Sequence, residues 1–136
     1  MEHRTKITVI WLMLVLCMML HFDYHVSGIF SGVDVQRPDA RGVYPPTLIL
    51  IRALFQVFPM GFALLTLFFA GRAVRIINLV LAVIYAPLHG FHVAGILRET
   101  PVDPTQVQLL VFTFLLSLLL AGVSWKWLKA YQTATI

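Results

Sequence analysis

The chain has little charge and almost no cysteine. Only 12% of its 136 residues are charged, against about 25% in a typical soluble domain. Its single cysteine, Cys17, excludes an intrachain disulfide, and its apolar neighbours indicate a small packing residue. Apolar residues are abundant instead: 60% of the chain is hydrophobic and the mean hydropathy is +0.87. This composition predicts an integral membrane protein.

Motifs of known chemistry are also missing. The sequence contains no HExxH, CxxC or CxxCH motif, no glycine-rich phosphate loop, no GxSxG elbow and no paired carboxylates. Asp23 is the only acid inside a predicted membrane segment, which argues against an ion pump with its own acid relay. We therefore expect a non-enzymatic protein.

Four apolar stretches are each long enough to span a bilayer, which takes about 20 residues. They cover residues 7–27, 47–70, 74–97 and 105–128. Together they use most of the chain, so we expect a single domain over residues 1–136. The first stretch ends in His21, Asp23, Tyr24 and His25 instead of a small-residue cleavage site, which favours a retained helix over a signal peptide. Residues 28–46 are rich in Gly, Pro and Asp and are expected to form turns without a helix.

The basic residues gather at one side of these stretches. They precede the first, separate the second from the third, and close the fourth: Arg4, Lys6, Arg72, Arg75, Lys126 and Lys129. This is the positive-inside pattern of a chain with both termini in the cytoplasm. The net charge of +4 is thereby explained by the membrane, and nucleic-acid binding is not expected.

Each stretch carries one stripe at helical spacing, and in three of the four the stripe collects most of the polar or small residues. The stripes are Trp11, Leu14, Met18, His21 and His25; Arg52, Gln56, Pro59, Ala63 and Thr66; Asn78, Ala82, Tyr85, His89 and His92; and Gln106, Leu110, Thr113, Ser117, Leu120 and Ser124. Such stripes face other helices while apolar faces meet lipid. We therefore expect an all-α, antiparallel four-helix bundle. Pro59 and Pro87 each remove a backbone hydrogen bond and should kink a helix or free a carbonyl.

Seven polar residues fall at about one depth in this topology, in what would be the outer half of the membrane. They are His21, Asp23, His25, Arg52, Gln56, His89 and His92. At about 1.5 Å per residue they lie roughly 3–15 Å below the outer boundary. Ionisable groups inside a membrane are expensive and mark a site or an internal pairing.

One interpretation of this layer is metal or haem ligation. His21 and His25 are spaced i, i+4, and His89 and His92 i, i+3, so each pair shares a helix face. Imidazole suits zinc, copper and iron. A more specific form of this interpretation is a haem b held by histidines of two helices. The alternative is that these histidines are amphipathic interface residues.

A second interpretation is an ion pair between Asp23 and Arg52. Removing one member of a buried pair is costly, so the two would stay together. However, Asp23 lies about 200° around the helix from His21, at about 100° per residue. Either the histidines or Asp23 can therefore face the centre. The alternative for Arg52 is that it snorkels to the outer headgroups.

A third interpretation is a pocket for an amphipathic small molecule, or a contact for a membrane-protein partner. Its expected residues are Asp23, Arg52, Gln56, Tyr85, His89 and His92. Aromatic residues surround them, although aromatics in membrane helices more often only pack. This pocket, in a non-enzymatic accessory or ligand-binding bundle, is the leading expectation, and haem or metal binding is the alternative.

Short motifs along most of the chain carry a family resemblance. They are Trp11 and Asp23, Pro59, the run Arg75-Ile-Ile-Asn78 with Tyr85, and Trp125-Lys126-Trp127. On these motifs the chain resembles a family of small bacterial four-helix membrane proteins of unknown function. The resemblance implies the fold and a place in the bacterial inner membrane, and it implies no activity. The two histidine pairs depart from the family's pattern, so it lends no support to haem binding.

The run from Leu54 to Pro59 is similar to the second helix of the sterol-isomerase and sigma-2-receptor-like superfamily. That resemblance implies a bundle around an amphipathic ligand, whose cation is bound by acids. It suggests an isomerase-like enzyme acting on a lipid as a further alternative. Only Asp23 could supply a pocket acid here, so the second acid of that mechanism is missing.

Overall fold

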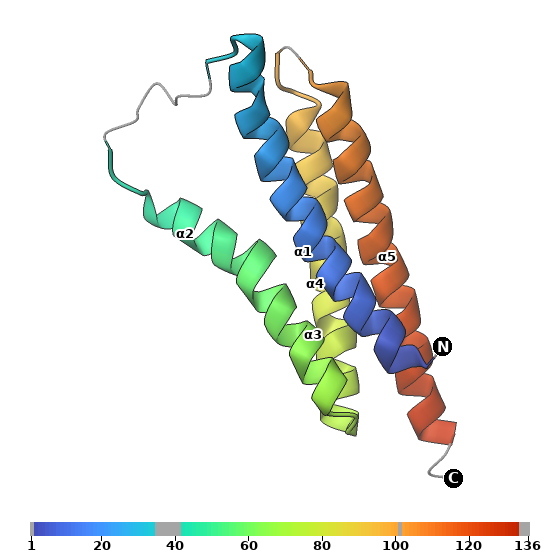
Figure 1. The fold of residues 1–136 in the computed structure, drawn as a ribbon. Helices are drawn as coiled ribbons and strands as arrows, with labels where there is room; N and C mark the ends of the chain where they lie inside the picture. The colour runs from blue at the N-terminus through green and yellow to red at the C-terminus, as the bar shows by residue number, and fades with distance from the viewer. Residues whose placement is uncertain (1, 35–41, 101, 134–136) are drawn as a thin grey trace.

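The computed structural model describes residues 2–34, 42–100 and 102–133, and these form helices, with no strand among them (Figure 1). The elements are α1 (His3–Ser27), the 3₁₀ helix η1 (Gly28–Ser31), α2 (Pro46–Arg52), the π-helical turn η2 (Ala53–Val57), α3 (Phe58–Phe68), α4 (Arg72–Ile96) and α5 (Pro104–Thr133). The length and apolarity of four segments fit membrane spans, with α2, η2 and α3 forming one of them. The all-helical class is therefore confirmed, and so are four helical segments that are long and apolar enough to cross a membrane.

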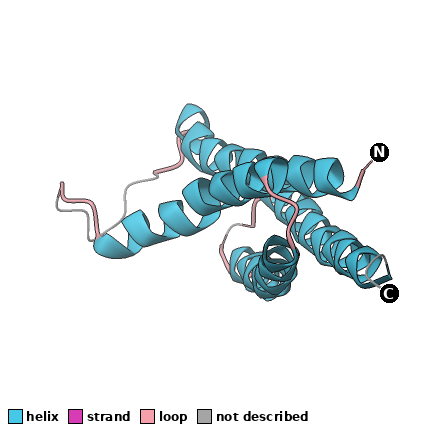
Figure 2. Cartoon of the chain, turned by 90° about the horizontal axis from the view of Figure 1, so that it is seen from below, coloured by secondary structure: helices cyan, strands magenta, loops and turns pink. Residues whose placement is uncertain are grey.

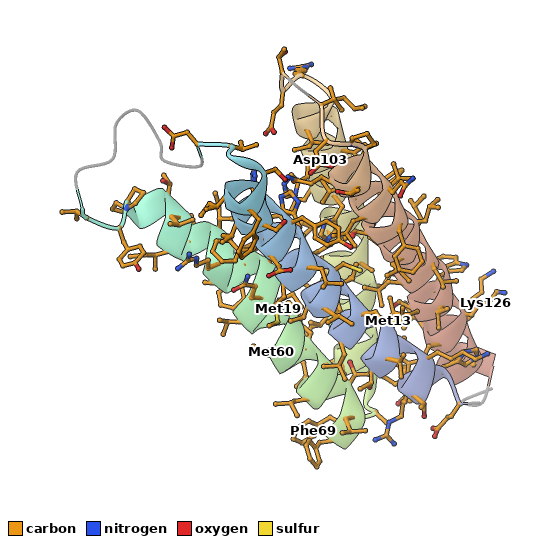
Figure 3. The ribbon with its side chains drawn as sticks, turned by 45° about the horizontal axis from the view of Figure 1, so that its top comes forward. Met13, Met19, Met60, Phe69, Asp103 and Lys126 are labelled. Atoms are coloured by element: carbon orange, nitrogen blue, oxygen red, sulfur yellow. The ribbon has the colours of Figure 1, made fainter. Side chains whose placement is uncertain are left out.

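The spans pack side by side with neighbours running in opposite directions (Figure 1). α1 packs against α3 and α5, α4 packs mainly against α5, and α1 and α4 lie diagonally across the bundle. Both described chain ends lie at the same end of the bundle, as do the labelled Phe69 and Lys126, whereas Asp103 lies at the other (Figure 3). We call the half that holds the chain ends the proximal half and the opposite one the distal half.

The predicted stripes form the core. All their positions are buried except His25, which is exposed, and Arg52, Gln56 and His92, which are half-buried. Large apolar side chains cover the outside of every helix, as expected where lipid is the solvent. The four exceptions all lie in the distal half, where the packing of the bundle is loosest.

A closed hydrogen-bond network joins three helices in the proximal half. The Trp11 indole nitrogen donates to Asn78 Oδ1 at 2.9 Å, and the Thr66 hydroxyl lies 3.0 Å from the same oxygen. The Asn78 amide nitrogen donates to the Val74 carbonyl at 3.0 Å. Asn78 and Thr66 are almost completely buried, so this network satisfies polar groups that would otherwise be costly.

Two arginines donate hydrogen bonds to carbonyls at the proximal end of the bundle, in α3, in the turn after it and in α5. Arg4 donates to the carbonyls of Thr66, at 3.3 Å, and Leu67. Arg75 donates to the Ala70 carbonyl at 3.0 Å and to the Trp127 carbonyl of α5 at 2.7 Å. A helix leaves its last carbonyls unpaired and carries partial negative charge there, so cations are favoured.

Some element boundaries differ from those expected. The first helix begins at His3 rather than at residue 7, and the last continues to Thr133 rather than ending at 128. Hydropathy marks only the apolar core, whereas the helical backbone continues into the basic flanks. The expectation of turns without a helix over residues 28–46 was wrong at its start, where η1 follows α1 directly and Gly32 ends it at φ 76°. Residues 35–41 of that loop lie outside the described residues.

Asp103 caps the N-terminus of α5. Its carboxylate accepts hydrogen bonds from the backbone N–H and the hydroxyl of Thr105, at 2.9 and 2.6 Å. These hydrogen bonds, and most of all the one from the Thr105 hydroxyl, lower the pKa of the Asp103 carboxyl below its usual range. A carboxyl group with a depressed folded pKa stabilises the fold above its unfolded pKa and loses that contribution as the pH falls through the folded one.

Asp103→Ala should therefore lower the free energy of unfolding by about 1 kcal/mol at neutral pH. Asp103→Asn, which keeps an acceptor, should lose much less. The difference between wild type and Asp103→Ala should shrink in acid, where the native carboxyl is protonated. Unfolding in detergent monitored by circular dichroism measures both effects, with the exposed Glu99→Ala as the control. An equal loss for Asp103→Asn and Asp103→Ala would contradict a capping role.

Candidate functional site

The second span contains a π-helical turn directly before Pro59. The Phe58 N–H donates to the Ala53 carbonyl, five residues back. Pro59 has no N–H, so it cannot serve the Leu54 carbonyl in the same pattern. The Tyr85 hydroxyl of α4 donates to that carbonyl instead. The expectation that Pro59 frees a carbonyl is thus confirmed, whereas α4 remains one helix across Pro87.

Beyond this turn α2 diverges from the other helices (Figures 1 and 2). Among the described residues, no Cα of α2 comes within 8 Å of a Cα in α1, α4 or α5. Its apolar side chains are largely exposed, as at Leu50, which is 65% exposed. π-Helical turns are frequent at functional sites, and here the turn separates a packed half-helix from an unpacked one.

Three histidines from two helices meet in the distal half. The ring of His21 lies edge-on to that of His92 with centroids 4.7 Å apart, and 5.4 Å from that of His25. His21 is buried, His92 is half-buried and His25 is exposed, so three members of the predicted layer lie together in the bundle. Sequence spacing placed each pair on one face, and the packing of the bundle brings α1 and α4 side chains together.

His89 lies beside this cluster and packs against two aromatic rings. Its ring centroid is 5.3 Å from that of Phe55 in η2 and 6.0 Å from that of Tyr85. Phe55 also lies 6.3 Å from His92. The π-helical turn therefore places one phenylalanine against both α4 histidines, at the point where α2 leaves the bundle.

Buried polar atoms of this cluster lack hydrogen-bond partners. They are His21 Nδ1, His89 Nδ1 and Gln106 Oε1, while the Gln106 amide nitrogen lies 3.4 Å from His25 Nδ1. The other such atoms, on His3, Thr8 and Ser124, lie near the opposite end. Buried polar groups are nearly always paired because leaving one unpaired costs about 1–3 kcal/mol. Unpaired buried atoms thus occur at both ends, and in the distal half they gather in one cluster from α1, α4 and α5.

Gln106 was not among the expected site residues. Its place on the stripe of the fourth stretch, level with the other polar residues, was the available signal. It adds α5 to the α1 and α4 walls of the cluster.

Arg52 and Asp23 do not form the expected ion pair in the described residues. The Arg52 guanidinium lies over the rings of Phe22 and Tyr44, 5.4 and 5.7 Å from their centroids. Asp23 is exposed, and His21 holds the inward position on α1. Of the two orientations left open by the sequence, the structure shows the one with imidazoles inside. Gln56, the remaining expected residue, is half-buried in η2.

Arg52 also lines a groove along α2. The groove has a volume of about 370 Å³ and is walled by Tyr44, Leu48, Ile49, Arg52, Ala53 and Val57. Its walls are apolar apart from the guanidinium and the tyrosine hydroxyl. It therefore offers space for a hydrocarbon chain beside a single permanent cation.

No group of three or more His, Cys, Asp or Glu side chains in the described parts of the chain is arranged to hold a metal ion. A haem would need only two axial histidines. However, the His21 and His92 rings contact each other directly, leaving no space for a flat macrocycle between them. This pair does not fit haem b in the arrangement seen.

No protein-family model, no curated protein and no solved structure matches this chain.

Proposed function

We propose that this chain is a small, non-enzymatic membrane protein that binds an amphipathic small molecule in its distal half. The observation that carries the proposal is the set of buried, unpaired atoms on His21, His89 and Gln106. Thr8 and Ser124 also carry buried unpaired atoms, but the distal ones belong to a cluster that joins side chains of three helices. A polar group of a ligand would satisfy them, and its apolar part would lie along the divergent α2.

The same proposal places the distal half toward the outer face of the bacterial inner membrane, with both termini in the cytoplasm. Its support is the set of basic residues at the proximal end: Arg4, Lys6, Arg72, Arg75, Lys126 and Lys129. A ligand would then enter from the outer leaflet. Mapping of an introduced cysteine at each end with a membrane-impermeant reagent checks this orientation.

An isomerase-like activity is less well supported. Such a mechanism would need two acids in the pocket, and Asp23, the only acid within the described part of the spans away from their ends, is exposed to the bundle exterior. Imidazoles and one amide can bind a polar group without changing it.

Substitution of the unpaired histidines tests binding directly. Wild type purified in mild detergent should carry a small molecule near equal stoichiometry, detected by native mass spectrometry. His21→Leu and His89→Leu should each reduce its occupancy at least tenfold, a change worth about 1.4 kcal/mol. Neither should lower stability much, because each removes a buried unpaired group.

Thr8→Val is the matched control, since it removes a buried unpaired hydroxyl from the proximal half of α1. It should leave the occupancy unchanged. A wild type without any bound molecule, or an equal occupancy in all four proteins, would rule the proposal out.

A further inference from the structure

The acids nearest the histidine cluster lie at its outer edge, with Glu99 near His92 and Asp103 near Gln106. Arg52 is permanently charged, and each neutral imidazole carries one N–H donor. Asp23, the only acid within the spans near this layer, faces outward. The cluster holds donors and an unpaired acceptor, Gln106 Oε1, so a preference for an anion would have to come from Arg52.

Arg52 lies well inside its span, about 9 Å along the helix from Pro46 at about 1.5 Å per residue. A charge in hydrocarbon is costly and is normally paired. Its neighbours are the π faces of Phe22 and Tyr44, which leave the hydrogen-bonding edges of the guanidinium without a carboxylate. A ligand anion would supply that partner in a bidentate arrangement.

The groove beside Arg52 indicates what the apolar part of the ligand would be. Its residues follow the helix at spacings of three and four, so it runs along α2 instead of across it. Its volume of about 370 Å³ is near the lower end of the usual range for small-molecule pockets. A flexible hydrocarbon chain could lie along such a run of apolar side chains.

We propose that the ligand is an anionic single-chain amphiphile, with its carboxylate or phosphate on Arg52 and its hydrocarbon chain in the groove of α2. This inference rests on the proposed function and specifies the ligand class of that site. Arg52 selects the charge of the head, and the apolar walls of the groove hold the chain.

Matched pairs of probes distinguish the effect of the head-group charge on binding from the effect of the hydrocarbon chain. Oleate is compared with oleyl alcohol, and oleoyl lysophosphatidate with monooleoylglycerol, so that each pair shares one chain. Titration followed by native mass spectrometry should show each anionic probe bound at least tenfold more tightly than its neutral partner. The two anions distinguish a fatty acid from a phospholipid source.

Arg52→Gln should reduce the ratio within each pair to about one, and Arg52→Lys should retain part of it. Arg98→Gln is the control, because Arg98 is an exposed arginine at the same end of the bundle. Unfolding of each variant in detergent is measured alongside, and Arg52→Lys decides the case if Arg52→Gln does not fold.

Equal binding of charged and neutral probes by wild type would overturn this inference. The proposed function would stand in that case if His21→Leu still removed the bound molecule. If wild type binds none of the four probes and carries no molecule of its own, both fail. A preference that survives Arg52→Gln would overturn the role of Arg52.

Discussion

Trp11→Ala is expected to lower the free energy of unfolding by about 3–5 kcal/mol, the usual range for a buried tryptophan. The side chain is completely buried. Its ring lies 5.3 Å from that of Phe62 and 5.2 Å, edge-on, from that of Tyr85. In a membrane, helix association depends on packing and interhelical hydrogen bonds, and this substitution removes both at the centre of the bundle.

The hydrogen-bond part of that loss can be isolated. Trp11→Phe keeps most of the ring but removes the indole donor to Asn78, and should cost about 1 kcal/mol. Its effect should not add to that of Asn78→Leu in a double-mutant cycle, because both break the same bond. Trp125→Ala, on the 51% exposed tryptophan of α5, is the control. A similar loss for Trp125→Ala and Trp11→Ala, measured by unfolding with sodium dodecyl sulfate, would refute the packing argument.

Arg75→Leu should lower the free energy of unfolding by about 2–3 kcal/mol. Its guanidinium donates to carbonyls of two segments, Ala70 and Trp127, and hydrogen bonds from charged donors contribute about 1.5–3 kcal/mol. It also lies over the ring of Trp127, with 4.7 Å to the centroid. Arg75 therefore links the end of α3 to the end of α5, which are not adjacent in the sequence.

Arg75→Lys should restore little of this loss, because an ammonium cannot donate in two directions while lying flat on a ring. Arg72→Leu removes an exposed arginine three residues away and provides the control. The same unfolding titration applies. If Arg72→Leu and Arg75→Leu lower the free energy of unfolding equally, the loss reflects the net charge of the proximal end, and the proposed link is wrong.

Much of the core could be predicted from the sequence, because membrane helices separate polar and small residues from apolar ones at a fixed period. The stripe through Asn78, Ala82, Tyr85 and His89 is buried throughout. That pattern depends only on the helix repeat and on lipid outside the bundle, and both are known without coordinates.

The distal half was less predictable, for reasons that particular residues show. Pro59 indicates that a carbonyl loses its partner, but whether the helix bends or forms a π turn depends on a hydroxyl supplied by Tyr85 from another span. By charge, Asp23 was one candidate partner for Arg52, and the sequence left open which side of α1 faces the centre. The direction in which each points depends on where α2 leaves the bundle, and a helix period carries no information about that.

The place where α2 leaves the bundle determines how a ligand's measured affinity depends on the surrounding lipid. α2 separates from its neighbours within the apolar span Pro46–Phe68, not in the loop beyond it. An amphiphile would therefore reach the groove from the surrounding bilayer after partitioning there. Its occupancy would follow its mole fraction among the lipids, and the same protein would show different aqueous dissociation constants at different lipid-to-protein ratios.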